Sequence, residues 1–226
     1  MHIKKELKRF WAFLQKDSWQ SWIVSVFIII ILIKFVFFPV LNFVTGSSRP
    51  LVIIESCSMY HGTTKEYSTI GDNAGLTENY RLCDKTFTKK ENINKSKYWQ
   101  TCGDFYESKN ISKTEFESFP FYSGLNKGDI IFVWGRSNYK IGDVIIFETK
   151  AKHPLIHRLI NLQPKATKGD HNEGQLSPTN NANGIDETNI SEEKILGKAV
   201  GRIPYLGWIK LIWFEPFRSS DGRGFC

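Results

Sequence analysis

The sequence predicts a mainly β domain that carries an α-containing insert and is anchored by an N-terminal transmembrane helix. Three observations lead to this fold class. One long apolar run lies near the N-terminus, several short β-branched runs follow it between turn residues, and no long helical pattern alternates with those runs as in a βαβ fold. With 226 residues and 41% hydrophobic content, the chain is long enough for one sizeable core besides the anchor.

The apolar run extends from Trp22 to Val44, which is about the ~20 residues that a bilayer-spanning helix needs. It contains Lys34 and Pro39. A lysine can reach toward the interface, and a membrane helix tolerates an interior proline when neighbouring groups satisfy the freed carbonyl. The run lacks the small-residue cleavage site of a removable signal peptide, so we expect a retained single anchor. A buried helix of a soluble protein is the alternative.

The positive charge gathers beside this run. Residues 1–21 form a basic tail, whereas a nucleic-acid binder concentrates its basic residues on a folded domain. The net charge of +7 therefore indicates membrane topology and no nucleic-acid partner. The positive-inside rule places residues 1–21 in the cytoplasm, residues 22–44 in the lipid bilayer and residues 45–226 on the exterior face of the plasma (cytoplasmic) membrane.

The exterior part contains five short apolar runs of strand length, at residues 51–56, 129–134, 143–148, 154–162 and 195–203. Two segments interrupt this pattern. Residues 63–123 are polar with scattered aromatic side chains, and we expect an inserted cap in which a helix starts at the capping box Ser112-Lys113-Thr114-Glu115. Residues 173–192 are poor in apolar side chains and are predicted to form a surface loop.

The four cysteines include no CxxC pair, which argues against a zinc ribbon or a thioredoxin-like site. Cys83 and Cys102 could pair in an oxidising compartment, and the sequence leaves this open. Cys57 adjoins Ser58, so a thiol mechanism is conceivable. Alternation along a strand would, however, point these two neighbouring side chains to opposite faces.

Ser58 follows an apolar strand only 14 residues beyond Val44, so at most ~46 Å of extended chain separates it from the bilayer. Serine is a poor nucleophile unless a nearby base takes its proton. His157, within the apolar run LIHRLI, is the candidate base, because burial would keep its imidazole neutral and the strand would hold the ring still.

A zinc site built from histidines is the competing interpretation of the same residues. His153 and His157 have the four-residue spacing of helical metal ligands, but Pro154 lies between them and the glutamate of an HExxH motif is missing. A site that used His61 or His171 has no spacing in its favour. No metal and no cofactor is therefore implied.

A set of motifs follows the anchor in a fixed order: SxSM comes first, and GDVIIF, HRLI, TKGDHN and GKAVGRIPYLG come after it. These ordered motifs resemble those of the type I signal peptidase family, and the resemblance covers the anchor and residues 51–60, 127–172 and 194–210. Bacterial members have lysine where this chain has His157, and the chain is similar to the archaeal and eukaryotic subgroup with a Ser/His dyad. The resemblance implies a signal-peptidase-like β-barrel or sandwich.

The resemblance also implies an activity and its residues. The chain would be a membrane-bound serine endopeptidase that removes signal peptides from translocated preproteins, through an acyl-enzyme, after a small-x-small motif. Ser58 matches the nucleophile, His157 the general base, Ser56 an oxyanion-stabilising hydroxyl and Asp170 an acidic residue that orients the histidine. Four apolar positions match those that line the pockets for small substrate side chains: Ile54, Met59, Leu155 and Ile156.

Two positions depart from the family pattern. Cys57 stands where the family usually has glycine, and Leu176 stands where archaeal and eukaryotic members often have a second aspartate. Asp186 could substitute for that aspartate only if the loop 173–192 folds back. The insert 63–123 has no counterpart in the minimal family pattern, and its role is open.

Partners follow from the same resemblance. They are the signal peptides of secreted preproteins and the lipid bilayer, with the protein translocation channel as a further candidate. The alternative from another class is a non-catalytic bitopic membrane protein with a partner-binding β ectodomain. Another membrane serine peptidase, which processes pilins or propeptides, would share the dyad but recognise a different cleavage motif.

Overall fold

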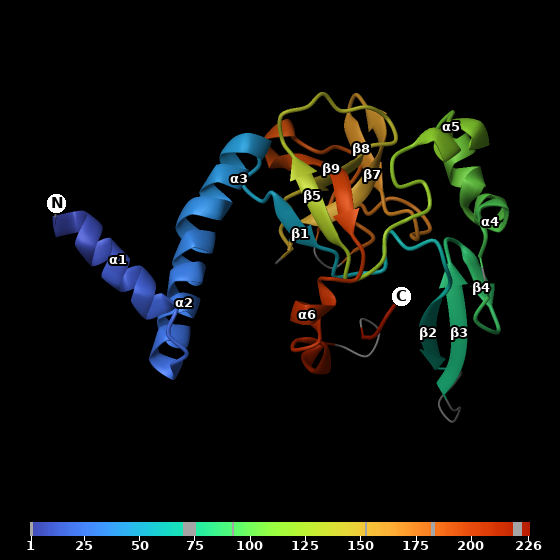
Figure 1. Cartoon of the computed structure of the whole chain (residues 1–226). Coiled ribbons are helices and arrows are strands. Elements are labelled where there is room, and N and C mark those ends of the chain that lie inside the picture. The colour runs from blue at the N-terminus through green and yellow to red at the C-terminus, as the bar shows by residue number, and fades with distance from the viewer. Residues whose placement is uncertain (1, 70–75, 92, 152, 182–183, 219–222) are drawn as a thin grey trace. The chain divides into compact units, whose positions relative to one another are not determined.

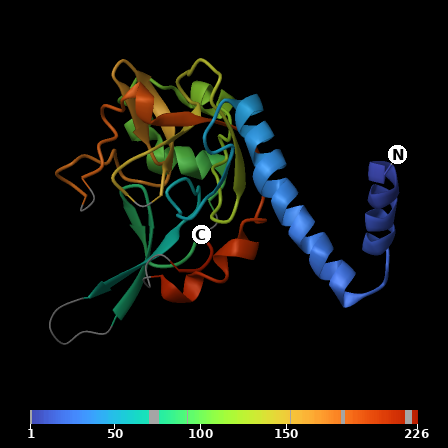
Figure 2. The same ribbon diagram turned by 90° about the vertical axis from the view of Figure 1, so that its left-hand side faces the viewer.

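The computed structural model describes residues 2–69, 76–91, 93–151, 153–181, 184–218 and 223–226. Residues 70–75 and 92 of the expected insert and residues 182–183 of the expected surface loop thus lie outside the described residues. The chain divides into two compact units, residues 1–46 and residues 47–226, whose elements are drawn in Figures 1 and 2.

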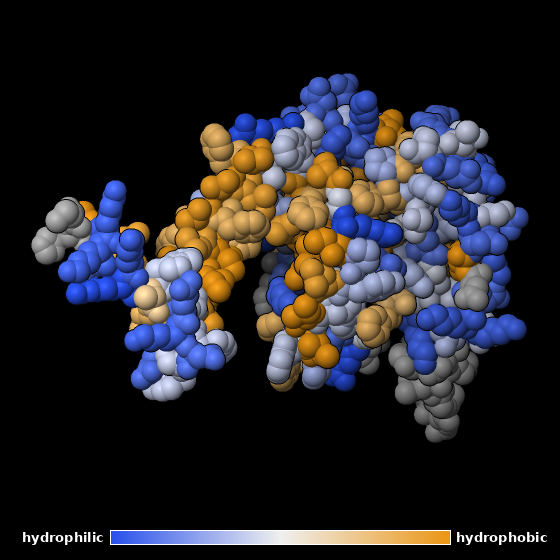
Figure 3. Space-filling model, in the orientation of Figure 1, coloured by the Kyte–Doolittle hydropathy of each residue, from blue (hydrophilic) through white to orange (hydrophobic). Residues whose placement is uncertain are grey.

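The first unit is helical. Its elements are α1 (His2–Leu14), α2 (Trp19–Leu32), the π-helical η1 (Ile33–Phe37) and α3 (Phe38–Thr45). The side chain of Ser18 caps α2 by accepting a hydrogen bond from the Ser21 N–H. From Trp19 to Thr45 the helix is continuous, and among the described residues it is the one helix long and apolar enough to cross a membrane. Apolar side chains cover this helix in Figure 3. The predicted apolar helix is confirmed and is a few residues longer than expected.

The proline inside this helix is accommodated by a local change in hydrogen bonding. Pro39 has no N–H to donate to a carbonyl one turn back. Just before it, the Phe38 N–H donates to the carbonyl of Ile33, five residues back, in a π-type turn. The helix continues past the proline and ends at Gly46, which has a φ of 65°.

The second unit is built on an antiparallel six-stranded sheet, so the mainly β fold class is confirmed. Its strands lie in the order β1 (Leu51–Ile53), β5 (Ile130–Trp134), β9 (Ile195–Ile203), β6 (Val144–Phe147), β7 (Leu155–Leu162) and β8 (Lys165–Lys168). All five apolar runs of the sequence contain strands of this sheet. In the order of strands, β1 and β8 stand at the two ends.

The core of the sheet lies where β6 and β7 pair. All four residues of β6 are buried, as an apolar run without alternation predicts. Ile145 of β6 pairs with His157 of β7, and β7 also pairs with β8, so this histidine is held in a strand that is bonded on both sides. Val133 of β5 and Ile156 of β7 pack with Ile146 in one apolar cluster beside it.

The insert consists of a small sheet and two helices. Its elements are β2 (Thr64–Thr69), β3 (Leu76–Leu82), β4 (Lys85–Phe87), α4 (Lys95–Glu107) and α5 (Lys113–Ser118). The start of α5 is confirmed, because the Ser112 side chain accepts a hydrogen bond from the Glu115 N–H. Cys83 and Cys102 form a disulfide, which joins the end of β3 to α4. The three-stranded sheet was not predicted, since its polar strands give no apolar alternation.

The loop 173–192 differs from the exposed loop that its composition predicts. Its described residues as far as Ser191 form no helix or strand, yet Ile185, Glu187 and Ile190 are buried. The loop therefore folds back onto the sheet. After β9 come α6 (Trp208–Leu211) and η3 (Glu215–Phe217), and a second disulfide joins Cys226 to Cys57.

Candidate active site

Ser58 lies in a turn five residues after the end of β1 at Ile53. Two backbone hydrogen bonds hold this turn. The His171 N–H donates to the carbonyl of Ser58 at 2.8 Å, and the Leu125 N–H donates to the carbonyl of Met59 at 2.8 Å. The backbone of the candidate nucleophile is therefore fixed by two segments that are distant in the sequence.

The side chains of Ser56 and Ser58 lie together, as the resemblance implies. Their hydroxyl oxygens are 3.1 Å apart, within hydrogen-bond distance. Ser56 is exposed and Ser58 is half-buried, so both can be reached from solvent. The two hydroxyls are thus placed where one could act as nucleophile and the other as a hydrogen-bond donor.

Cys57 is disulfide-bonded to Cys226 and so carries no thiol. A thiol mechanism at this residue is therefore excluded in this structure. The sequence argument from strand alternation does not apply, because residues 57 and 58 lie in a turn and not in β1. The disulfide instead ties the end of the chain to the turn that carries Ser58.

His157 is almost completely buried in β7, with 1% of its surface exposed. Its Nδ1–H donates a hydrogen bond to Oε1 of Glu187. Its Nε2 is buried and has no hydrogen-bond partner among the described residues. A neutral imidazole protonated on Nδ1 presents a bare lone pair on Nε2, and this is the state that a general base requires.

The Glu187 carboxylate is held by more than the histidine. The Thr167 hydroxyl donates to Oε1 at 2.8 Å, and the Leu176 N–H donates to Oε2 at 2.8 Å. Burial raises the pKa of this carboxyl, but the interaction with His157 and the two other hydrogen bonds outweigh burial, and the net pKa is lowered. Glu187 is therefore a charged, fixed acceptor beside the histidine.

The His157 ring and the turn that carries Ser58 both lie close to Gly169. A Cβ built on this glycine would lie 2.8 Å from His157 Nε2 and 2.8 Å from the Ser58 carbonyl oxygen. These two atoms are therefore no further apart than the sum of the two distances. Any side chain at residue 169 would fill the space between His157 Nε2 and the Ser58 backbone carbonyl.

Asp170 is placed differently from our expectation. Its Oδ1 accepts from Arg158 Nε and the Tyr106 hydroxyl, both at 2.9 Å, and its Oδ2 accepts from Arg158 Nη2 at 2.6 Å and His61 Nε2 at 2.8 Å. Burial would raise the pKa of Asp170, but the Arg158 guanidinium and the His61 ring bring it far below its usual range. The orienting contact that we expected from Asp170 is instead made by Glu187, because both Asp170 oxygens are committed to other partners.

Sequence reasoning offered Asp186 as a substitute for the second family aspartate and missed its neighbour Glu187. The loop does fold back toward Leu176, as a replacement for the second family aspartate requires, but Asp186 is exposed and Glu187 is buried. A signal was present in the sequence, because Ile185 and Ile190 are isolated apolar residues in an otherwise polar loop. Ile185 and Glu187 are two apart, which puts them on one face of an extended segment.

A pocket of about 440 Å³ lies beside Ser58. Its walls are β1 and the turn after it, the segment that leads into β7, and the side chains of Lys210 and Arg218. Five of the predicted site residues line it: Ile54, Ser56, Ser58, Leu155 and Ile156. Met59 differs from our prediction of a pocket residue. It is 1% exposed, packs in the apolar core, and its sulfur accepts from the Asp170 N–H at 3.5 Å.

No family model matches the sequence. The signal peptidase complex catalytic subunit sec11 of Sclerotinia sclerotiorum is 34% identical over 101 residues, covering 40% of this chain and 57% of the relative. The proteins of the same name from Zygosaccharomyces rouxii and Lachancea thermotolerans are 35% and 37% identical over 101 and 102 residues, and each match covers 40% of this chain and 58% of the relative. The chain thus spans a little over half the length of these relatives.

These matches cover less than half of the chain, and the geometry of Ser58, His157 and Glu187 is a separate line of support. The resemblance to type I signal peptidases is confirmed, and the homologues of this chain are named as catalytic subunits of signal peptidase complexes.

Proposed function

We propose that this chain is a membrane-bound signal peptidase I, a serine endopeptidase that removes signal peptides from translocated preproteins. The observation that carries the proposal is the buried, unbonded Nε2 of His157, which lies next to the Ser58 backbone while a charged Glu187 holds the other side of the ring. A neutral, oriented imidazole beside a serine is the arrangement that activates a hydroxyl for attack.

The chemistry is acyl transfer to Ser58 and then to water. His157 Nε2 takes the hydroxyl proton while Oγ bonds to the scissile carbonyl carbon. The tetrahedral intermediate collapses as the same proton passes to the departing amine, and the peptide C–N bond breaks. Water then loses a proton to His157 and attacks the ester carbon. The same proton passes from His157 to Ser58 Oγ as the ester C–O bond breaks, which releases the carboxylic acid product and restores the serine hydroxyl. In the structure Ser58 Oγ bonds to the Ser56 hydroxyl and not to His157 Nε2, so the proposed proton transfer requires a rotation about the Ser58 Cα–Cβ bond.

Charge that develops on the substrate oxygen needs hydrogen-bond donors. The Ser56 hydroxyl and the Ser58 N–H are proposed to fill this role. Ser56 is exposed at the pocket and only 3.1 Å from the Ser58 hydroxyl. One such donor is typically worth about 3 kcal/mol of transition-state stabilisation.

The substrate is proposed to bind as an extended strand. β1 stands at the end of the sheet order, and the pocket runs along it opposite Leu155 and Ile156. Addition of a strand to a free sheet edge binds the backbone, and side-chain pockets then give specificity. Ile54, Leu155 and Ile156 would contact alternate side chains near the cut, which suits a small-x-small motif.

The proposal also includes the arrangement of the chain relative to the membrane. We propose that residues 1–21 are cytoplasmic, that residues 22–44, within the helix Trp19–Thr45, span the plasma membrane, and that residues 45–226 lie on the exterior face. The two disulfides in residues 47–226 support an oxidising compartment. An anchor keeps enzyme and preprotein on one surface and so raises their effective concentration. The bilayer and the translocation channel are the proposed partners beside the signal peptide.

The test is cleavage of a preprotein by the purified full chain in detergent or liposomes, with the new N-terminus identified by mass spectrometry. The expected result is one cut after a small-x-small motif, abolished in Ser58→Ala and kept in the control Ser118→Ala, whose serine lies in the exposed part of α5. Processing that is unchanged in Ser58→Ala would support a non-catalytic membrane protein. A cut at another motif would identify a different membrane peptidase.

A further inference from the structure

The loop Gly169–His171 touches both members of the dyad. The His171 N–H donates to the Ser58 carbonyl at 2.8 Å, and Gly169 leaves the space into which His157 Nε2 points. The position of this loop therefore contributes to the separation of Ser58 from His157, together with the Leu125–Met59 hydrogen bond and the Cys57–Cys226 disulfide that also hold the serine turn. The contacts that hold the loop thus also support the dyad.

One side of the loop is held by two phenols of α4. The Tyr106 hydroxyl donates to Asp170 Oδ1 at 2.9 Å, and the Tyr98 hydroxyl donates to the Asp170 carbonyl at 2.8 Å. Both tyrosines are buried, at 0% and 2% exposure. Burial, together with the Asp170 charge, raises the pKa of both phenols well above the ordinary value, so both remain donors.

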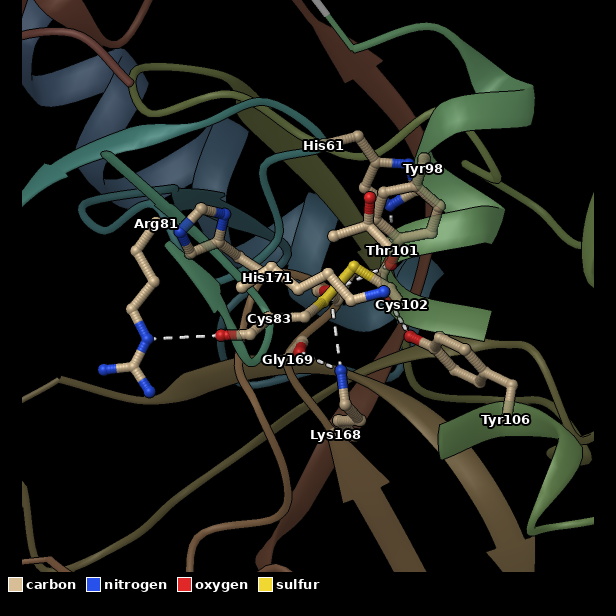
Figure 4. The surroundings of a disulfide bond; sticks show 12 residues. His61, Arg81, Cys83, Tyr98, Thr101, Cys102, Tyr106, Lys168, Gly169 and His171 are labelled. Carbon is tan, nitrogen blue, oxygen red and sulfur yellow. Dashed lines mark hydrogen bonds and ion pairs between the residues drawn. A yellow bond between two sulfur atoms is a disulfide. The ribbon is translucent and has the colours of Figure 1, made fainter. Parts of the chain in front are cut away.

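A disulfide reinforces the same face of α4. Tyr98, Cys102 and Tyr106 follow one another at four-residue spacing, which places all three on one side of the helix. Cys102 is bonded to Cys83, whose N–H donates to the His171 carbonyl at 3.0 Å. Figure 4 shows the disulfide and the two tyrosines around the loop. The insert thus contacts Asp170 through the two tyrosine hydroxyls, and it contacts the next residue, His171, through the Cys83 backbone N–H.

Lys168 also links the loop to α4. It is fully buried, and its Nζ donates to the Gly169 carbonyl at 3.1 Å and to the Asp170 carbonyl at 3.4 Å. The same Nζ lies 5.0 Å from the Phe105 ring centre and 5.1 Å from that of Tyr106. Burial lowers the pKa of Lys168 to about 8, although the Asp170 charge opposes this shift.

We propose that the insert is a positioning element for the dyad. The face of α4 formed by Tyr98, Cys102 and Tyr106 fixes the loop Gly169–His171, and the loop fixes Ser58 relative to His157. Tyr98 and Tyr106 are positioning residues, because they act through Asp170 and touch no reacting atom. The catalytic consequence rests on the proposed function, whereas the fixing of the loop is a property of the fold and can be measured without activity.

The first measurement is hydrogen–deuterium exchange on the full chain in detergent, comparing wild type with Tyr98→Phe/Tyr106→Phe. This double variant removes both hydroxyls and keeps both rings. The expected result is about tenfold or faster exchange in the peptide that contains residues 169–171, since two buried hydrogen bonds to the loop are lost. The control Tyr122→Phe removes a hydroxyl that pairs with Lys95 in the same insert and should leave this exchange unchanged. Equal exchange in the double variant and wild type would overturn the proposal.

The second measurement is the split between kcat and KM on a preprotein. Because neither tyrosine lines the pocket beside Ser58, kcat should fall about tenfold while KM stays within about twofold. Faster exchange with an unchanged kcat would refute the positioning role. If the double variant does not fold, Tyr106→Phe alone carries the same two readouts. A wild-type chain that fails to cleave would refute the proposed function, and the exchange result would still decide whether the insert fixes the loop.

Discussion

Glu187 accepts a hydrogen bond from Nδ1 of His157, a residue 30 positions earlier in the chain. The contact joins a loop without regular structure to β7, which pairs with β6 on one side and β8 on the other. It fixes the tautomer of the imidazole and points Nε2 at the space left by Gly169. The carboxylate that we propose to orient His157 therefore comes from position 187 and not from position 176, where this chain has leucine and archaeal and eukaryotic members of the family often have an aspartate.

Glu187→Gln should reduce kcat by roughly 10³-fold or more, with little change in KM. The amide keeps the shape of the side chain, but it can present an N–H to Nδ1 and so favour the wrong tautomer of His157. Steady-state kinetics on a preprotein measure this. The neighbouring Asp186→Asn, at an exposed site, is the control and should have wild-type kinetics. A Glu187→Gln enzyme with near wild-type kcat would show that His157 does not need this carboxylate.

Gly169→Ala should abolish most activity and lower Tm. The added Cβ would approach both His157 Nε2 and the Ser58 backbone to 2.8 Å, and a backbone oxygen cannot move aside cheaply. The matched control is Gly174→Ala, since a Cβ there meets nothing within 4 Å. Thermal unfolding and cleavage assays of the two variants measure the effect. Equal behaviour of the two variants would contradict the close packing at the dyad.

Removal of the Cys83–Cys102 disulfide should lower the free energy of unfolding by about 3 kcal/mol. The bond closes a loop of 19 residues, and constraint of the unfolded chain by a loop of this size contributes about that amount. The double variant Cys83→Ala/Cys102→Ala is compared with wild type by urea unfolding, because alanine adds no buried polar group. A loss below about 0.5 kcal/mol would mean that the bond leaves the stability of the domain unaffected.

Stability should fall as the pH drops from about 6.5 toward 4, and His171 should account for part of the loss. Burial lowers its pKa to about 4, while its Nδ1–H donates to Tyr60 and its Nε2 accepts from Thr64. Between the two pKa values the unfolded chain binds a proton that the folded chain does not, so acid favours unfolding by up to roughly 3 kcal/mol. Thermal unfolding at pH 7 and 5 measures the slope. The decrease in Tm from pH 7 to pH 5 should be smaller in His171→Gln. It should be unchanged in the control His153→Gln, because His153 is exposed. An unchanged slope in His171→Gln would assign the effect to other groups.

The parts of the fold that the sequence predicts are those with a local pattern. The anchor and the five apolar strands follow from hydropathy over short windows, and the start of α5 follows from the capping box at Ser112. The strands β2 to β4 escaped prediction because residues 64–87 are mostly polar. These three strands form a small sheet of their own and are not part of the six-stranded sheet.

The site residues also fall into those with a local sequence pattern and those without one. Ser58 and His157 stand beside recognisable motifs, whereas Glu187 reaches the histidine only because a 20-residue loop folds back onto the sheet. The contacts of Asp170 were not predicted, for a related reason. Its partners Arg158, Tyr106 and His61 come from three separate segments, and no pattern within any one segment reveals that they meet.

The most direct test of the central claim is a double-mutant cycle on kcat/KM for preprotein cleavage, with Ser58→Ala, His157→Ala and the variant that carries both. If the hydroxyl and the imidazole act as one unit, each single change costs roughly 10³-fold or more, and the combined variant loses no more than the worse single one. Losses that multiply would show that the two side chains act independently, and would contradict the proposal that His157 activates Ser58.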